Sequence, residues 1–127
     1  TDLMATAAAV SGARLPAEAA EDSIDMLPAL LGRKGKRQAI VHHSSDGAFA
    51  IRQGRWKLLL HQGAGDNNYA KVAPQPAVSE PELPGQLYDL ASDPAENVNL
   101  YGQRPEIVAR LTALLKKYQD EGRSTPR

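Results

Sequence analysis

The feature that most constrains the fold is a stretch of alternating side chains on either side of one glycine. Residues 48–61 read AFAIRQGRWKLLLH. In an extended chain Phe49 and Ile51 point to one face, and the second arm alternates in the same way from Trp56 onward. Gly54 can take the positive φ that a two-residue hairpin turn requires. The stretch therefore predicts a β-hairpin. Because it holds the only tryptophan and the only phenylalanine of the chain, we expect it to seed the hydrophobic core.

The flanking segments extend this hairpin into a small sheet. Residues 39–43 read as a strand, and the Asp-Gly pair at 46–47 is a hairpin signal, so three antiparallel strands follow one another. Residues 87–90, Leu-Tyr-Asp-Leu, form a brief segment that could add a fourth strand.

The clearest single element is an amphipathic helix near the C-terminus. Pro105 is a favourable first helical residue, and Gly122 suits the end. Between them the apolar residues form one helical stripe: Ile107, Val108, Leu111, Leu114, Leu115 and Tyr118. A four-stranded antiparallel sheet needs one face covered, and this helix can cover it. The sequence thus predicts an α+β fold, in which a small antiparallel sheet of about four strands is covered by the C-terminal amphipathic helix.

The N-terminal segment is helical but has no strand before it on which to pack. Residues 2–13 are rich in alanine, and Gly12 marks a helix end. Residues 26–32 predict a short apolar helix or turn, which Asp25 could cap and Gly32 could end. Two interpretations fit the segment: a helical arm packed on its own domain, or the opening of the chain in the middle of a larger domain.

Two segments between the sheet and the last helix have distinct signals. Residues 62–85 contain four prolines, several glycines and no apolar periodicity. A structureless loop of that length is usually either functional or disordered. Further on, Asp93 suits an N-cap, Pro94 the first helical residue and Glu96 the return partner of a capping box. This pattern predicts one turn of helix.

Composition excludes several classes of function. The chain has no cysteine, which rules out disulfides, thiolate metal sites and a cysteine nucleophile within it. Its 15 basic and 15 acidic residues balance, without a block of like charge, which argues against nucleic acid as a partner. No apolar run approaches the ~20 residues of a membrane span, so no membrane partner is expected.

The histidines are the first candidates for chemistry. His42 and His43 are neighbours in a predicted strand, so they face opposite ways and would line one site only with a bulge. His61 ends the third predicted strand, and packed or solvated roles are the commoner ones for all three. The chain has no His-Glu-x-x-His, Gly-x-Ser-x-Gly or glycine-rich phosphate motif. Carboxylates such as Asp89 fit turns and caps. The residues therefore predict an accessory domain with no catalytic residue and no metal ligand of its own.

Four short motifs follow one another in the second half of the chain. They are AIRQGRWK at 50–57, LYDL at 87–90, DPAE at 93–96 and NL at 99–100, with a terminal helix after them. Their order and spacing resemble the C-terminal region of sulfatases of the arylsulfatase type, in the alkaline-phosphatase-like superfamily. That family has an Ala-hydrophobic-Arg-x-Gly-x-aromatic-Lys strand pair, then Leu-Tyr-Asp-Leu, Asp-Pro-x-Glu and Asn-Leu.

The N-terminal third extends the resemblance over nearly the whole chain. Residues 22–32 look like the family's Asp-Gly-x-Ser-Leu-Leu-Pro-x-Leu-x-Gly, with Ser23 where glycine is usual. Residues 2–13 are similar to the last helix of the catalytic domain. The resemblance implies that 1–37 are the end of the catalytic α/β domain and a connector, and that 38–127 are the sulfatase C-terminal subdomain.

The resemblance also implies an activity and cofactors for the parent protein. Sulfatases hydrolyse sulfate esters with a formylglycine made from the Cys or Ser of a Cys/Ser-x-Pro/Ala-x-Arg motif, and with a calcium ion held by Asp and Asn side chains. This chain lacks that motif: in Ser124-Thr125-Pro126-Arg127 the arginine comes one residue early. We therefore expect a C-terminal fragment that neither hydrolyses sulfate esters nor binds calcium by itself. The parent would be periplasmic or secreted.

The partners that the resemblance implies are the sulfatase catalytic domain and, through the parent, a sulfated small molecule or glycan. His42, His43 and the loop 62–85 are our candidates for the rim of the substrate pocket. Arg52 and Lys57 match motif positions, and we expect them to form hydrogen bonds and salt bridges within the sheet.

A function of a different class stays open. The chain could be a free-standing binding or assembly module, for instance for glycans, that uses the Trp56 hairpin and the long loop. Aromatic side chains exposed on a flat sheet would favour this alternative. A separated sulfatase fragment should instead leave an apolar interface uncovered, which self-association would hide.

Overall fold

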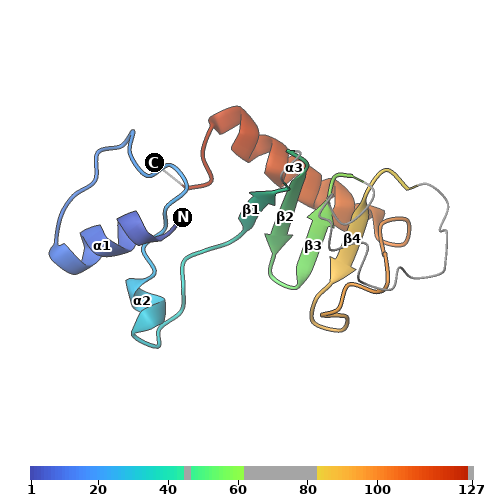
Figure 1. Ribbon diagram of the computed structural model, residues 1–127, viewed down its shortest axis with the longest axis horizontal. Helices are drawn as coiled ribbons and strands as arrows, with labels where there is room; N and C mark the ends of the chain where they lie inside the picture. The colour runs from blue at the N-terminus through green and yellow to red at the C-terminus, as the bar shows by residue number, and fades with distance from the viewer. Residues whose placement is uncertain (45–46, 62–82, 126–127) are drawn as a thin grey trace. The chain divides into compact units, whose positions relative to one another are not determined.

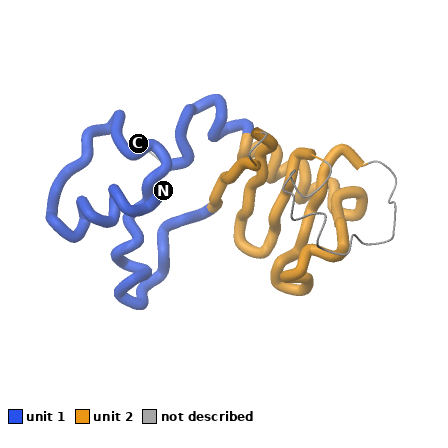
Figure 2. The backbone as a smooth tube through the Cα atoms, viewed as in Figure 1, with its two compact units in different colours: residues 1–38, 116–127 blue, residues 39–115 orange. Residues whose placement is uncertain are grey.

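The computed structural model describes residues 1–44, 47–61 and 83–125. The chain divides into two compact units, coloured separately in Figure 2. We call residues 1–38 together with 116–127 the terminal unit, and residues 39–115 the sheet unit. The predicted loop 62–85 lies outside the described residues except for its last three positions, and so does Asp46 of the predicted Asp-Gly turn.

The sheet unit contains four antiparallel strands in sequential order, as Figure 1 shows. They are β1 (Ile40–His43), β2 (Phe49–Gln53), β3 (Trp56–Leu59) and β4 (Gln86–Asp89). Gly54, at the turn between β2 and β3, has φ 60°, the positive value that this turn was expected to need. The predicted fold class and the order of the strands are confirmed.

One face of the sheet, which we call the helix face, carries the core. Val41, Ile51, Leu58 and Leu87 are cross-strand partners in one row, so their side chains share this face. The last three of these side chains are fully buried, and so are Leu111 and Leu115 of α3 (Pro105–Glu121). Arg110 of α3 donates a hydrogen bond to Gln53, which lies on the same face as Ile51. The helix therefore covers this face, as the apolar stripe predicted.

The phenylalanine and the tryptophan of the chain lie at the ends of the strands rather than at the centre of the core. Phe49 begins β2 and is 37% exposed, whereas Trp56 begins β3 and is half-buried. The guanidinium of Arg55 lies 5.8 Å from the centroid of the Trp56 ring. The hairpin at 48–61 does supply core residues, as expected, but through Ile51 and Leu58 rather than through these two aromatics. The middle rows of the sheet, which the helix covers, hold aliphatic side chains.

The other face of the sheet, which we call the second face, has a smaller cluster. Ala50, Leu59 and Tyr88 are buried there, and Leu90 packs against them. His42 is the cross-strand partner of Ala50 and so points to this face.

The segment after β4 forms a turn instead of the predicted turn of helix. Asp93 accepts hydrogen bonds from the backbone N–H of Val98, at 2.8 Å, and from the side chain of Asn97, at 3.2 Å. These bonds lower the pKa of Asp93, the bond from Val98 most of all. Glu96 has φ 58°, a left-handed conformation that cannot continue a right-handed helix. Its carboxylate binds Lys57 instead of closing a capping box.

An asparagine covers the outer edge of β4. The side-chain oxygen of Asn99 accepts from the backbone N–H of Leu87, at 3.0 Å, and of Tyr101, at 2.9 Å. Its amide donates to the carbonyl of Gly85, and Leu100 N–H donates to the carbonyl of Leu87. An edge strand with open backbone groups is a template for aggregation, and Asn99 with Leu100 occupies those groups on β4.

The terminal unit contains two helices, α1 (Leu3–Ser11) and α2 (Leu27–Leu30). Gly12 ends α1 with φ 72°, as predicted. Asp25 accepts from the backbone N–H of Leu27 at 2.9 Å, which confirms its capping role. All nine residues of α1, each described by the structure, are exposed or half-buried. Within the described part of the chain, no helix has both the length and the apolar character needed to cross a membrane.

Candidate functional site

The two candidate histidines point to opposite faces of the sheet. His42 pairs with Ala50 and lies on the second face, whereas His43 pairs with Phe49 and lies on the helix face. The register of β1 against β2 runs through both without a bulge, so the orientation expected from strand alternation is confirmed. The ring of His43 meets the ring of Phe49 edge-on, with centroids 6.1 Å apart, and its Nδ1 lies 2.9 Å from the carbonyl oxygen of Ser44. The two imidazoles therefore cannot line one site.

His42 lies close to an ion pair. Burial lowers the pKa of His42, the positive charge of Lys57 lowers it further, and Glu96 acts in the opposite direction. The Nζ of Lys57 donates to both carboxylate oxygens of Glu96, at 2.7 and 2.8 Å. Arg52 donates to the carbonyl of Gly54 at 3.2 Å. The structural roles expected for Arg52 and Lys57 are thus present, and the pKa of His42 lies below its ordinary value.

A second ion pair joins the hairpin turn to β4. The guanidinium of Arg55 binds both oxygens of Asp89, the one buried charged residue of the described chain, at 7% exposure. The hydrogen bonds from Arg55 lower the pKa of Asp89 to about 2, and the same bonds raise the pKa of Arg55. Asp89 also accepts from the backbone N–H of Ala91, so the turn role that we assigned to it is present together with this pair.

Sequence reasoning missed the pairing of Arg55 with Asp89. A signal for it was present in the sequence. Arg55 lies in the turn of the hairpin, and Asp89 ends the strand that pairs with the second arm of that hairpin. Trp56 is the cross-strand partner of Asp89, which places Arg55 beside the end of β4.

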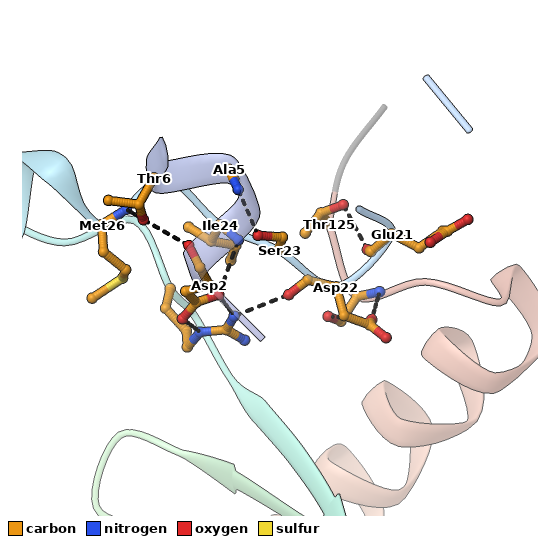
Figure 3. Close-up of polar contacts among 11 residues, drawn as sticks. Asp2, Ala5, Thr6, Glu21, Asp22, Ser23, Ile24, Met26 and Thr125 are labelled. Atoms are coloured by element: carbon orange, nitrogen blue, oxygen red, sulfur yellow. Dashed lines mark hydrogen bonds and ion pairs between the residues drawn. The ribbon is translucent and has the colours of Figure 1, made fainter. Parts of the chain in front are cut away.

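In the terminal unit, polar contacts converge on a short segment that we call the hub, residues 21–26 (Figure 3). On one side it holds the start of α1. The hydroxyl of Ser23 accepts from Ala5 N–H at 2.9 Å, and the carboxylate of Asp2 accepts from Ile24 N–H at 3.0 Å. The hydroxyl of Thr6 accepts from the backbone N–H of the last hub residue at 3.0 Å.

Arg37 reinforces this side of the hub. It binds the carboxylate of Asp2 and donates to the carbonyl of Asp22 at 3.0 Å. The hydrogen bond from Arg37 lowers the pKa of Asp2 more than burial raises it. Because the carboxylate of Asp2 serves Arg37 and Ile24, the helix N–H of Ala5 needs another acceptor. Ser23, which stands where the sulfatase motif has glycine, supplies it.

The polar side chains of the ion pairs and of the hub form hydrogen bonds with the backbone and with one another. In residues 1–44, 47–61 and 83–125, no group of three or more His, Asp or Glu side chains could hold a metal ion. The described side chains thus do not fit the calcium ion that the resemblance implies, and the chain has no Cys/Ser-x-Pro/Ala-x-Arg motif from which a formylglycine could form. Every buried side-chain nitrogen and oxygen in the same part of the chain has a hydrogen-bond partner.

Comparison with known proteins identifies relatives by sequence. No protein-family model matches the chain. It is 35% identical over 116 residues to the N-acetylgalactosamine-6-O-sulfatase of Bacteroides thetaiotaomicron, a match that covers 91% of this chain and 22% of that protein. It is 36% identical over 129 residues to arylsulfatase A of Homo sapiens, which covers 89% of this chain and 25% of that protein.

Solved structures give the same relationship. A structure described under the metabolism of multiple glycosaminoglycans by Bacteroides thetaiotaomicron matches with a TM-score of 0.69 at 31% identity, over 94% of this chain and 24% of that one. The structure of a 2-O GAG sulfatase matches with a TM-score of 0.63 at 28% identity, over the same shares. The chain thus spans about a quarter of the length of the proteins it matches. The relatives named here are sulfatases, and the chain matches only one part of each, which is consistent with a C-terminal sulfatase region.

Proposed function

We propose that this chain is the C-terminal region of an enzyme that hydrolyses sulfate esters, and that it serves the enzyme by packing on the catalytic portion. The observation that carries the proposal is the coverage: about nine-tenths of the chain matches sulfatases, but only 22–25% of their length is matched. In this proposal residues 1–37 are the end of the catalytic α/β domain and a connector, and residues 38–127 are the C-terminal subdomain.

The surface of the terminal unit supports the packing role. Leu3 is 83% exposed and Val10 is 68% exposed on α1, and Leu30 of α2 is 73% exposed. A helix that is apolar on all sides is normally buried in a larger protein. The catalytic portion of the sulfatase would cover these side chains. In the isolated chain the same surface would promote self-association.

The chain alone should have no activity. The test is hydrolysis of p-nitrophenyl sulfate by the purified 127-residue chain, with and without calcium. We expect no hydrolysis above the buffer rate and no change in melting temperature when calcium is added or chelated. Turnover by the chain, or a melting temperature that rises with calcium, would overturn this part of the proposal.

The gene context tests the packing role more directly. We expect the reading frame upstream of Thr1 to encode a Cys/Ser-x-Pro/Ala-x-Arg motif. The upstream protein, expressed separately, should bind this chain and suppress its self-association. A reading frame that starts near Thr1, with no such motif upstream, would contradict the proposal.

We also propose that a histidine of β1 contributes to the rim of the substrate pocket. His42 and His43 are both candidates; because they lie on opposite faces of the sheet, we propose His42, which is exposed on the second face beside Lys57, as the rim residue. The test compares His42→Ala with its matched neighbour His43→Ala in the intact enzyme. We expect a raised KM for the first variant and an unchanged KM for the second. An unchanged KM in both would refute the rim role.

The alternative, a glycan-binding module, has one observation in its favour. Phe49 is 37% exposed and stands beside the exposed ring of His43. Aromatic rings of this kind can stack on sugars. Retention of the chain on immobilised glycans, lost in a Phe49→Ala variant, would support the module.

A further inference from the structure

The end of the chain folds back onto its beginning within the terminal unit (Figure 3). Ser124 donates from both its backbone N–H, at 2.9 Å, and its hydroxyl, at 2.8 Å, to the same carboxylate oxygen of Asp22. Thr125 donates from its N–H, at 3.2 Å, and its hydroxyl, at 2.8 Å, to the carbonyl of Glu21. The contacts join residues 102 and 104 positions apart in sequence.

The tail that makes these contacts is itself held in shape. Gly122, with φ 63°, ends α3 and turns the chain, and Arg123 N–H then donates to the carbonyl of Tyr118. The guanidinium of Arg123 donates to the carbonyl and the hydroxyl of Thr125, at 3.0 and 3.2 Å. It also donates to the carbonyl of Ala17 at 3.1 Å. Residues 123–125 are half-buried, so the tail packs against the rest of the terminal unit.

The hub links this tail to α1. The carboxylate and carbonyl of Asp22 bind the tail and Arg37 respectively, and the next residue, Ser23, caps α1 through Ala5. Ala20 enters the hub with φ 59°, a conformation that L-residues adopt only where the surroundings enforce it. The tail contacts on either side of Ala20, at Ala17 and at Glu21, are such surroundings.

We propose that residues 123–125 are a clasp that holds residues 17–22 in place and thereby orders α1. The occupant of this surface of the hub is the C-terminal tail of the same chain. Since the terminal unit contains residues 1–38 and 116–127, it can be completed only after residues 123–125 have been synthesised. The inference concerns this chain alone and does not depend on the proposed packing against a catalytic portion.

Hydrogen exchange followed by mass spectrometry tests the clasp. The intact 127-residue chain is compared with a chain that ends at Gly122 and with a Ser124→Ala/Thr125→Val variant, which keeps the backbone but removes two donors. We expect exchange at residues 3–6 and 23–26 to speed up at least tenfold in the truncated chain, and by a smaller factor in the double variant. Exchange in β2, β3 and β4 should not change.

A matched control uses Ser11→Ala. The hydroxyl of Ser11 bonds only locally, to Ala8 in its own helix, and this variant should leave exchange at the hub unchanged. Unaltered protection of residues 3–6 in the truncated chain would overturn the proposal. So would fast exchange there in the intact chain, because the clasp would then be insufficient to order α1. Equal acceleration in the sheet would show a global loss of stability instead, and would also overturn it.

Discussion

At Glu96, an ion pair stabilises the fold and a left-handed backbone conformation destabilises it, and two substitutions can separate these effects. Its carboxylate binds Lys57, and its backbone has φ 58°. Replacement by alanine removes the ion pair and leaves a side chain in the left-handed region. Replacement by glycine removes the same ion pair but relieves the backbone, because glycine adopts positive φ without steric conflict.

The magnitudes follow from the local geometry. The side chains of Lys57 and Glu96 are 20% and 31% exposed, so their bonds are partly shielded from water. Hydrogen bonds to charged groups contribute about 1.5–3 kcal/mol, and the partial exposure favours the lower end, about 1.5 kcal/mol. A non-glycine residue in the left-handed region is less stable by about 1–2 kcal/mol. We expect Glu96→Ala to lower the free energy of unfolding by about 1.5 kcal/mol. With the lower backbone figure of about 1 kcal/mol, Glu96→Gly should lower it by only about 0.5 kcal/mol.

Urea unfolding followed by tryptophan fluorescence measures this difference. Trp56 is the only tryptophan of the chain and lies in β3, so the signal reports on the sheet unit. In a Lys57→Met background the loss of stability caused by Glu96→Ala should largely vanish, whereas the advantage of Glu96→Gly over Glu96→Ala should persist. Equal stabilities of Glu96→Ala and Glu96→Gly would refute the backbone argument. A coupling to Lys57 close to zero would refute the ion-pair argument.

Two further predictions concern the same unit. The pKa of Asp89 is lowered from 3.8 to about 2 in the folded chain, so its contribution to stability is full above pH 3.8 and is lost as the pH falls towards about 2. In the Asp89→Asn variant, stability should therefore fall less steeply as the pH is lowered through this range. Urea midpoints measured across that range check this, and an unchanged pH profile in the variant would contradict it. Leu58→Ala should lower the free energy of unfolding by roughly 3–5 kcal/mol, because Leu58 is fully buried. The same change at Leu60, which is 40% exposed two positions along, should have an effect below about 1 kcal/mol.

The fold was predictable where local pattern and tertiary packing agree. The alternation around Gly54 and the stripe that contains Leu111 each specify both an element and its buried face, so strand order and helix cover followed from the sequence. The predicted helical turn at 93–96 is wrong because the residues that suit a helix N-terminus also suit a non-helical turn. Asp93 does accept backbone and side-chain hydrogen bonds, but Glu96 reaches across to Lys57, a partner 39 positions away that a local motif cannot reveal.

The candidate site was predictable only in part, for the same reason. Strand alternation separates His42 from His43, and this was visible in the sequence. The tail contacts to Asp22 were not visible, because no periodicity links positions 102 residues apart. The role of Ser23 also needed the structure, since a hydroxyl that replaces a motif glycine becomes meaningful only when Ala5 is seen to lack another acceptor.

The motifs that carry the sulfatase resemblance hold the fold together in this chain. Lys57 of the strand pair binds Glu96 of the Asp-Pro-x-Glu motif, and Asp89 of Leu-Tyr-Asp-Leu binds Arg55 in the hairpin turn. Asn99 of Asn-Leu closes the edge of β4. Since their polar groups bind one another or the backbone, the part that these side chains play in this chain is to hold its strands, turns and edge in place.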